Sequence, residues 1–320
     1  MLTLKSNITI GDYTYNGVVE FNAQSTWETL TDTASITFPR KVEWQGKELA
    51  TGDSPLIRRG DPVLVELGYD QGSDVIYRAI VFRGFVTSIH ATIPIVVDCE
   101  DAAWLLKQQT LKKSYKDAQL SDLLKDLLPS TVPSEGPQVR LGPFRISNAT
   151  PAMVFEKIRE KYFLKSWFRA GKMYCGFAYL PALQSRHTIR FDQHVVENDL
   201  KYVNEEDVKI SLKIISVSPD NKKTEYQFGD PDGEVRTVYY YDKNASDVNH
   251  MGSQEIERLR YTGYRGSLTI FGDPFVQHGD VLDIHDPFYP ERDGSYLVKS
   301  VEISFGSGGF RQLLTLDIKV

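Results

Sequence analysis

Histidines and aspartates are the residues whose spacing in this chain comes nearest to a metal or catalytic site. His278 and His285 flank one predicted strand, with Asp280 and Asp283 between them. Imidazole and carboxylate groups together could bind Zn²⁺ or activate a water molecule. On an extended strand, however, residues seven positions apart point to opposite faces, so the two imidazoles cannot meet at one ion. We therefore predict no metal ligands and no cofactor.

Cysteine, serine and glycine patterns point to no other chemistry. Cys99 and Cys175 form no CxxC pair, which favours two buried thiols over a zinc site. The sequence contains no G-x-S-x-G motif. Residues 306–309 (GSGG) lie between two predicted strands and do not open a helix, as a phosphate-binding loop would. We predict no catalytic residue and no enzymatic activity, although a pair of distant carboxylates would escape such a search.

Two adjacent segments carry opposite charge. Residues 151–190 contain eight lysines and arginines against two glutamates, whereas residues 191–208 contain six acidic residues against one lysine. Such segments could form complementary faces between subunits, although two solvated surfaces would give the same pattern. The candidate interface charges are Lys161, Lys165, Arg169, Lys172, Glu197, Asp199, Glu205 and Glu206.

The overall composition is that of a folded globular protein. Of 320 residues, 41% are hydrophobic and 25% are charged, and the net charge is -6. A negative balance argues against specific nucleic-acid binding, which needs a basic surface. No apolar run reaches the roughly 18 residues of a membrane-spanning helix. The N-terminus has no signal-peptide pattern, so we expect synthesis in the cytoplasm.

Hydrophobic periodicity divides the chain into three parts. Residues 1–100 alternate as strands and predict a first small β-barrel. Leucines at helical spacing mark an α+β middle domain over residues 101–187. Residues 188–320 return to strands and predict a second β-barrel, with one short helix around 253–261. The predicted fold class is mainly β, with two similar small β-barrel domains flanking a helical insertion.

The two β regions contain similar turns. Gly60-Asp61 precedes a strand in the first region, and Gly279-Asp280 precedes a strand in the second. A second strand follows each turn, and we align its residues Val86 and Val301. Gly60, Gly279 and Gly84 are expected to permit tight backbone conformations, and Asp61 and Asp280 to stabilise the turns. We infer an internal duplication, although Gly-Asp before a strand is common turn chemistry.

The order of these parts resembles the phage late control protein D and baseplate hub family, which is related to the hub part of type VI secretion spike proteins. The resemblance covers essentially the whole chain and rests on the order of several short motifs. These are residues 96–101 (VVDCED), 118–124 (AQLSDLL), 148–158 (NATPAMVFEKI), 167–174 (WFRAGKMY) and 278–281 (HGDV).

The resemblance implies a structural hub of a phage tail baseplate or a related injection system. Three copies would form a ring in which two similar barrels per copy give pseudo-sixfold symmetry. The implied partners are two further copies of the chain, the tail tube protein, a separate central spike protein and other baseplate proteins. The implied location is the virion tail or an assembled injection particle, after synthesis in a bacterial cytoplasm.

A different function stays open at this point: a tail-associated β protein that binds carbohydrate or degrades cell wall. Its best candidate is the run Tyr239-Tyr240-Tyr241, because exposed aromatic rings are suited to stacking on sugars. Alternation places Tyr239 and Tyr241 on one face of a strand, where packing against the core or another subunit would explain them equally well.

Overall fold

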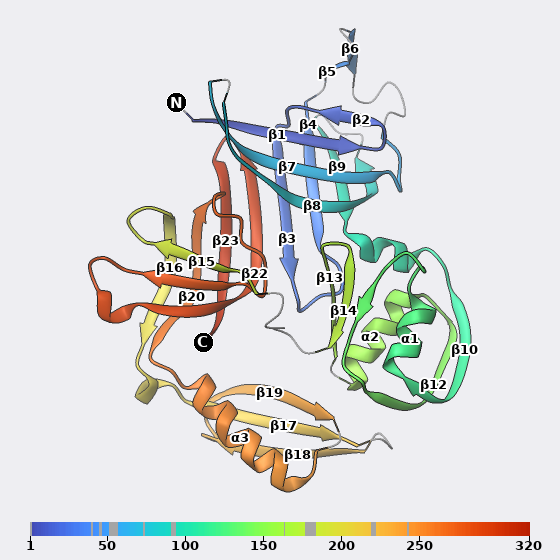
Figure 1. The fold of residues 1–320 in the computed structure, drawn as a ribbon, viewed down its shortest axis with the longest axis vertical. Helices are drawn as coiled ribbons and strands as arrows, with labels where there is room; N and C mark the ends of the chain where they lie inside the picture. Colours follow the sequence, from blue (N-terminus) through green and yellow to red (C-terminus); the bar gives the residue numbers. More distant parts are fainter. Residues whose placement is uncertain are drawn as a thin grey trace.

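The structure is a computed structural model of the chain. It describes residues 2–39, 41–44, 47–50, 57–72, 74–90, 94–162, 164–176, 184–218, 222–241 and 243–320. The fold is mainly β with an α+β middle part, as the sequence predicts (Figure 1). Among the described residues, no helix is both long and apolar enough to cross a membrane.

The first β region forms half of a large sheet. Its strands are β1 (Leu2–Ile10), β2 (Tyr13–Tyr15), β3 (Glu20–Thr26), β4 (Thr33–Phe38), β7 (Pro62–Gln71), β8 (Asp74–His90) and β9 (Ile95–Glu100). A separate hairpin is formed by β5 (Lys41–Trp44) and β6 (Lys47–Ala50). In Figure 1, β1, β7 and β8 run across β3 and β4, so the sheet curls around its own buried face.

The middle part follows β9 directly. It contains the 3-10 helix η1 (Ala102–Lys107), β10 (Leu111–Gln119), α1 (Leu120–Leu127), β11 (Ser134–Glu135), β12 (Arg140–Ala149), α2 (Pro151–Tyr162), β13 (Lys165–Arg169) and β14 (Lys172–Gly176). The apolar faces of α1 and α2 pack into a core of their own, in which Leu120, Leu123 and Ile158 are fully buried. The Thr150 hydroxyl accepts a hydrogen bond from Met153 N and so caps α2.

The second β region completes the large sheet. Its strands are β15 (Arg186–Arg190), β16 (Val195–Val203), β20 (Gly263–Phe271), β21 (Val281–His285), β22 (Gly294–Gly306) and β23 (Gly309–Lys319), with η4 (Pro290–Arg292) before β22. Buried and part-exposed side chains alternate without interruption along β23, as expected for a strand with one face on the core.

Residues 205–259 make up a small additional layer that the three-part division of the sequence does not contain. After η3 (Glu205–Asp207), β17 (Ile210–Val217), β18 (Lys223–Gly229) and β19 (Glu234–Tyr241) form their own sheet. The helix α3 (Ala245–Leu259) covers that sheet, begins earlier than the sequence suggests, and buries Val248 against it. This α/β layer therefore has a separate core within the second β region.

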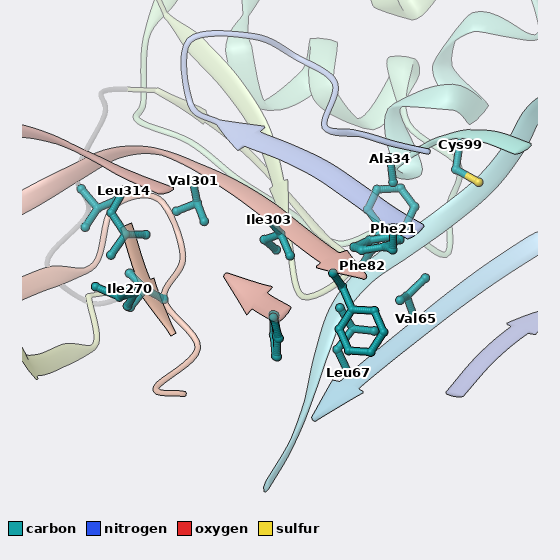
Figure 2. Close-up of a cluster of buried hydrophobic side chains, with 14 of the residues drawn as sticks. Phe21, Ala34, Val65, Leu67, Phe82, Cys99, Ile270, Val301, Ile303 and Leu314 are labelled. Atoms are coloured by element: carbon teal, nitrogen blue, oxygen red, sulfur yellow. The ribbon is translucent and has the colours of Figure 1, made fainter. Parts of the chain in front are cut away.

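The two β regions are joined into one 13-stranded sheet. Strand β22 of the second region pairs antiparallel with β3 of the first, from Ser300 opposite Thr26 to Phe305 opposite Phe21. Their buried faces consequently form one continuous hydrophobic core. Figure 2 shows side chains from both regions in this core: Phe21, Ala34, Val65, Leu67, Phe82, Cys99, Ile270, Val301, Ile303 and Leu314.

Candidate functional site: paired turns and a three-way junction

The turns at Gly60 and Gly279 have the same backbone geometry. Their φ angles are +91° and +85°, in the region that favours glycine. Gly60 N donates to Val86 O at 2.8 Å, and Gly279 N donates to Val298 O at 2.7 Å. The return bonds match as well, because Val86 N donates to Asp61 O and Val298 N to the carbonyl of Asp280.

These bonds correct the alignment drawn from the sequence. The counterpart of Val86 is Val298 and not Val301. The segment between Asp280 and Val298 is therefore shorter than the segment between Asp61 and Val86. Val86 lies far along β8, which begins at Asp74, whereas Val298 lies close to the start of β22 at Gly294, and this accounts for the difference in spacing. Gly84 lies on β8, where a Cβ atom would come within 2.1 Å of the Glu100 carbonyl oxygen.

The aspartates close the two turns in the same way. Asp61 Oδ2 accepts a hydrogen bond from Arg58 N at 2.7 Å, and Asp280 Oδ2 accepts one from Gln277 N at 2.9 Å. Both Asp61 N and Asp280 N donate to the carbonyl three residues earlier. The paired turns are therefore alike in backbone and in side chain.

Asp280 also connects the second β region to the middle part. Its side chain is 2% exposed and accepts hydrogen bonds from Arg169 Nη2 at 2.7 Å and His187 Nε2 at 3.1 Å. Burial raises the pKa of the Asp280 carboxyl, but the hydrogen bonds from His187 and Arg169 outweigh it and hold the pKa below its ordinary value. A second guanidinium nitrogen of Arg169 donates to His278 O. One arginine thus ties the β13–β14 hairpin to this turn.

A hydrogen-bonded chain next to this turn joins the first and second β regions. Ser25 Oγ, at the end of β3, lies 2.7 Å from Asp32 Oδ2 and 2.7 Å from His278 Nδ1. These are the residue types of a serine hydrolase, but the order is wrong. In a catalytic triad the imidazole lies between the serine and the carboxylate, whereas here the serine lies between the other two. This series of hydrogen bonds therefore does not activate Ser25 as a nucleophile.

A cavity of about 290 Å³ adjoins this hydrogen-bonded chain. Its walls come from β3, β8, the β13–β14 turn and the segment before β21. The lining includes the aromatic rings Phe82, Phe168 and Phe275, and the polar side chains Ser25, Asp32, Asp101, Arg169 and His278. Local sequence patterns do not reveal this cluster, since Ser25 and His278 are 253 positions apart.

The candidate basic interface residues have partners within the chain. Arg169 belongs to the buried pair described above. Lys172 Nζ lies 2.6 Å from Glu135 Oε2, and the Lys165 ammonium lies 5.1 Å from the centroid of the Trp27 ring. Burial lowers the pKa of Lys165 from its ordinary value. Arg169 and Lys165 are thus drawn into contacts between the middle part and the β regions.

Lys161 and the acidic candidates lie on more open surfaces. The Lys161 ammonium lies 5.2 Å from the centroid of the Tyr162 ring, and burial and the neighbouring charge of Lys157 lower its pKa. Strand β16 pairs only with β20 among the described strands, so its other edge is open. The acidic candidates Glu197 and Asp199 on β16, and Glu205 and Glu206 on η3, are exposed. No ion pair joins these four to any described residue.

The other reactive residues of the sequence occupy structural positions. His278 is buried, while His285 lies on the surface and pairs with Asp293 Oδ2 at 2.7 Å. Within the described ranges, no three histidine, cysteine or acidic side chains come together as metal ligands would. Cys99 and Cys175 are both free and buried, as predicted, and burial raises their pKa values to about 12 and about 11.

Tyr240 and Tyr241 in β19 hold the small α/β layer in place. Tyr240 packs against its core, and Tyr241 packs against the core of the middle part. The Tyr241 hydroxyl also donates to Arg140 O, at the start of β12. Tyr240 and Tyr241 therefore join two layers of the protein, and neither is free to stack on a sugar.

Solved structures identify the fold. A tail protein from Neisseria meningitidis MC58 superposes with a TM-score of 0.66 at 14% identity, over 99% of this chain and 96% of that one. The 43 kDa tail protein of prophage MuSo2 from Shewanella oneidensis superposes with a TM-score of 0.61 at 12% identity, over 98% and 97% of the two chains. The chain has the phage tail-protein fold.

The tail-protein fold also occurs in secretion machinery. The E. coli c3393 protein, a type VI secretion component described as similar to the T4 tail proteins gp27 and gp5, superposes with a TM-score of 0.58 at 7% identity. The match covers 99% of this chain and 76% of that one. No protein-family model and no curated protein matches the sequence. The fold is therefore shared with proteins whose sequences are at most 14% identical to this one.

Proposed function

We propose that the chain is a structural hub of a phage tail baseplate or a related injection system. Three copies form a ring that joins the tail tube to a central spike. The observation that carries this proposal is the pair of matching turns at Asp61 and Asp280, which relates the two β regions of one chain. The whole-length likeness to tail proteins supports the same assignment.

The paired turns suit a protein that joins two parts of different symmetry. A spike with threefold symmetry and a tube with sixfold symmetry need an adaptor between them. Three chains with two quasi-equivalent β regions each present six similar surfaces while keeping threefold symmetry. The open edge of β16 is an aggregation hazard unless a neighbouring subunit covers it, so this edge is one contact of the proposed ring.

Charged side chains determine how the two subunits align at this contact. The exposed acidic side chains Glu197, Asp199, Glu205 and Glu206 face a basic surface of the next subunit that includes Lys161 and Lys172. Lys165 and Arg169 act inside the chain and hold the middle part in place beside that surface. Other baseplate proteins bind around the ring, which resides in the virion tail or the assembled injection particle. This role requires no enzymatic activity.

The mass of the purified protein in solution tests the proposal. Multi-angle light scattering over a range of concentrations should give three times the chain mass of 36.4 kDa. The same measurement with the spike and tube proteins should give a larger complex that retains three copies. A monomer that stays monomeric with both partners would rule out the hub. Electron microscopy of the complex should then show six similar densities around a threefold axis.

A further inference from the structure

The two β regions have the same order of paired strands. In the first region the order is β3-β4-β9-β8-β7, and in the second it is β16-β20-β23-β22-β21. Each neighbouring pair is antiparallel in both regions. The matching Gly-Asp turns precede β7 and β21, which hold the same place in the two orders. Strand β8 therefore corresponds to β22, and β3 corresponds to β16.

A bulge lies at the same point of β8 and β22. On β8 the register against β9 shifts by one residue between Val86 and Ser88. On β22 the register against β23 shifts by one residue between Val298 and Ser300. Val86 and Val298 are the residues that bond to the two matching turns. A bulge is a specific feature of a fold, so its repetition shows that Ser88 corresponds to Ser300.

The strand pairing also relates the residues of β3 to those of β16. From Ser88 and Ser300, the successive Cα partners across each sheet are Asp98, Ser35 and Asn22 in the first region, and Thr315, Ser267 and Asp199 in the second. Asn22 on β3 therefore corresponds to Asp199 on β16. Four residues further along the same strands, Thr26 corresponds to Val203.

One copy of this arrangement is complete and the other is open. After its bulge, β22 has β23 on one side and β3 on the other. The strand β8 pairs with β7 only as far as Phe85 and with β9 from Phe85 to His90. Among the described strands, the end of β8 thus has a neighbour on one side only, and β16 pairs only with β20. The chain joins β22 to β3 but leaves the corresponding edges of β8 and β16 unpaired.

Both open edges carry apolar side chains that face the core side of the sheet. Ile89 lies opposite Val97, which is fully buried, yet Ile89 is 40% exposed. Its counterpart Val301, which has β3 beside it, is 1% exposed. On β16, Tyr202 lies opposite the buried Tyr264 and shares its face of the sheet. Another strand beside Ile89 would cover it as β3 covers Val301.

We propose that the open edge of β8 binds β16 of a second copy of this chain, antiparallel and in the register by which β22 binds β3. The proposal rests on the proposed ring and names the strand that β16 meets in the next subunit. Within the chain, the pairs are Ser300 with Thr26, Val301 with Ser25 and Glu302 with Gln24. The corresponding pairs between subunits are Ser88 with Val203, Ile89 with Tyr202 and His90 with Lys201.

This pairing closes a ring with one kind of junction. The β22–β3 junction within each chain alternates with the β8–β16 junction between chains, so every β region has two similar neighbours. A head-to-tail contact of this kind gives a closed ring when the rotation between copies fits a whole number of subunits. The pairing also satisfies the backbone groups of two open strand edges and covers Ile89 with Tyr202.

Cysteine cross-linking on the full chain tests the register. His90 and Lys201 are both exposed, so His90→Cys with Lys201→Cys should leave the fold intact. Directly opposite Cα atoms of antiparallel strands lie about 4.5–5.5 Å apart, within the range of a disulfide. With diamide as oxidant, the double variant should give a covalent trimer on a non-reducing denaturing gel, and a reducing agent should return it to single chains. The natural Cys99 and Cys175 are buried and should not take part.

The matched control moves one cysteine along the same strand. In His90→Cys with Glu197→Cys, the second cysteine is exposed on β16 but lies four residues from position 201. Four residues of a strand span roughly 13 Å, which is too far for a disulfide. This variant, and each single cysteine variant, should give no covalent trimer.

Ile89→Ser tests the apolar part of the contact without a cross-link. We expect the concentration for half-assembly, measured by light scattering, to rise at least about tenfold. Ile76→Ser changes the same residue type on the same strand, at a position that is 53% exposed and outside the proposed pairing. It should leave assembly unchanged.

The outcomes separate this proposal from the hub itself. A covalent trimer from the pair at 90 and 201, without one from the pair at 90 and 197, supports the pairing. If light scattering shows a trimer but the first pair does not cross-link, or both pairs cross-link equally, the pairing is wrong and the hub stands. A chain that stays monomeric with the spike and tube proteins rules out both. If the reduced double variant does not assemble, Ser88→Cys with Val203→Cys replaces it, because the same register pairs these two positions.

Discussion

Asp61 and Asp280 close two copies of one turn, but their surroundings differ. Each carboxylate accepts a hydrogen bond from the backbone N–H three residues earlier, at 2.7 Å for Asp61 and 2.9 Å for Asp280. Asp280 is 2% exposed and additionally binds Arg169 and His187, whereas Asp61 remains part-exposed. The second copy has therefore become the attachment point of the middle part, while the first has kept only the turn.

Removing Arg169 should destabilise the chain strongly. In Arg169→Ala, the buried Asp280 carboxylate loses its guanidinium partner at 2.7 Å and keeps His187 and the backbone N–H groups of Ser185 and Gln277. Breaking such a buried pair costs roughly 3–5 kcal/mol. Urea unfolding measures the change. Arg186→Ala, which breaks an exposed pair with Asp283, is the control and should cost much less. Equal losses in the two variants would contradict the role assigned to Arg169.

The paired turns should respond alike to a side chain at their glycines. Gly60→Ala and Gly279→Ala place a Cβ atom on a backbone with φ near +90°, which costs roughly 1–2 kcal/mol. The loss of stability should be somewhat larger in Gly60→Ala, because the new Cβ atom lies 3.1 Å from the Trp104 ring. Thermal unfolding gives both values. Gly17→Ala, whose Cβ meets nothing within 4 Å, should leave the melting temperature nearly unchanged.

The sequence predicts those parts of the fold that depend on local pattern. Alternation in the β regions, leucine spacing in α1 and the Thr150-Pro151 start of α2 are local signals, and the structure contains each of them. The pairing of β22 with β3 has no such signal, because both strands read as half-buried whichever neighbour they pair with. The continuous core across the two β regions could not be predicted for this reason.

No local sequence pattern predicts the contact between Asp280 and Arg169 either. The Gly-Asp pattern predicts that Asp280 stabilises a turn, and it does so by accepting a hydrogen bond from Gln277 N. Its contact with Arg169 crosses 111 positions and requires the middle part to fold back onto the second β region. The basic neighbours of Arg169 in the sequence predict a surface charge at this position. Burial of a charge depends on packing and not on neighbours in sequence, so composition assigned it to the wrong environment.

The stability of the chain should depend on pH through Asp32. The folded chain retains the Asp32 proton up to about pH 7, whereas the unfolded chain releases it near the ordinary value of 3.8. Between these values, raising the pH favours unfolding by up to about 1.4 kcal/mol per pH unit. Asp32→Asn lacks this proton. Its free energy of unfolding relative to the natural chain should therefore rise with pH across this window and level off above pH 7.

Ser25→Ala provides a second test of the raised pKa of Asp32. The Ser25 hydroxyl lowers the pKa of Asp32, so its removal should move the upper end of the window above 7. Urea unfolding at several pH values measures both variants. His278, whose pKa is depressed to about 4, has the opposite effect, because stability is lost as the pH falls from about 6.5 toward 4. A pH-independent difference between Asp32→Asn and the natural chain would contradict a raised pKa.

The Gln312 side chain should stabilise the loop over residues 271–276, which borders the cavity. The fully buried side chain accepts from Val276 N at 2.9 Å and donates to the carbonyls of Phe271 and Pro274 at 3.0 and 2.7 Å. Gln312→Met preserves length but leaves these backbone groups without partners, at about 1–3 kcal/mol for each one that stays buried. Gln108→Met, at an exposed glutamine, should have little effect. Comparable melting temperatures would show that water replaces the lost bonds.

Reversing the charge of the acidic surface should weaken the proposed ring. Glu205→Lys with Glu206→Lys places positive charge opposite the basic face that includes Lys161, so like charges would meet across the contact. We expect the concentration for half-assembly, measured by light scattering, to rise at least about tenfold at low salt.

The matched control carries the same change in net charge elsewhere. Glu20→Lys with Glu257→Lys alters exposed residues on β3 and α3 and should leave assembly unchanged. The difference between the two double variants should shrink as salt screens exposed charges, since the Debye length falls to about 3 Å at 1 M. Adding Lys161→Glu to the first double variant should restore part of the lost affinity. Assembly that is indifferent to Glu205 and Glu206 would place the contact at another edge of the sheet.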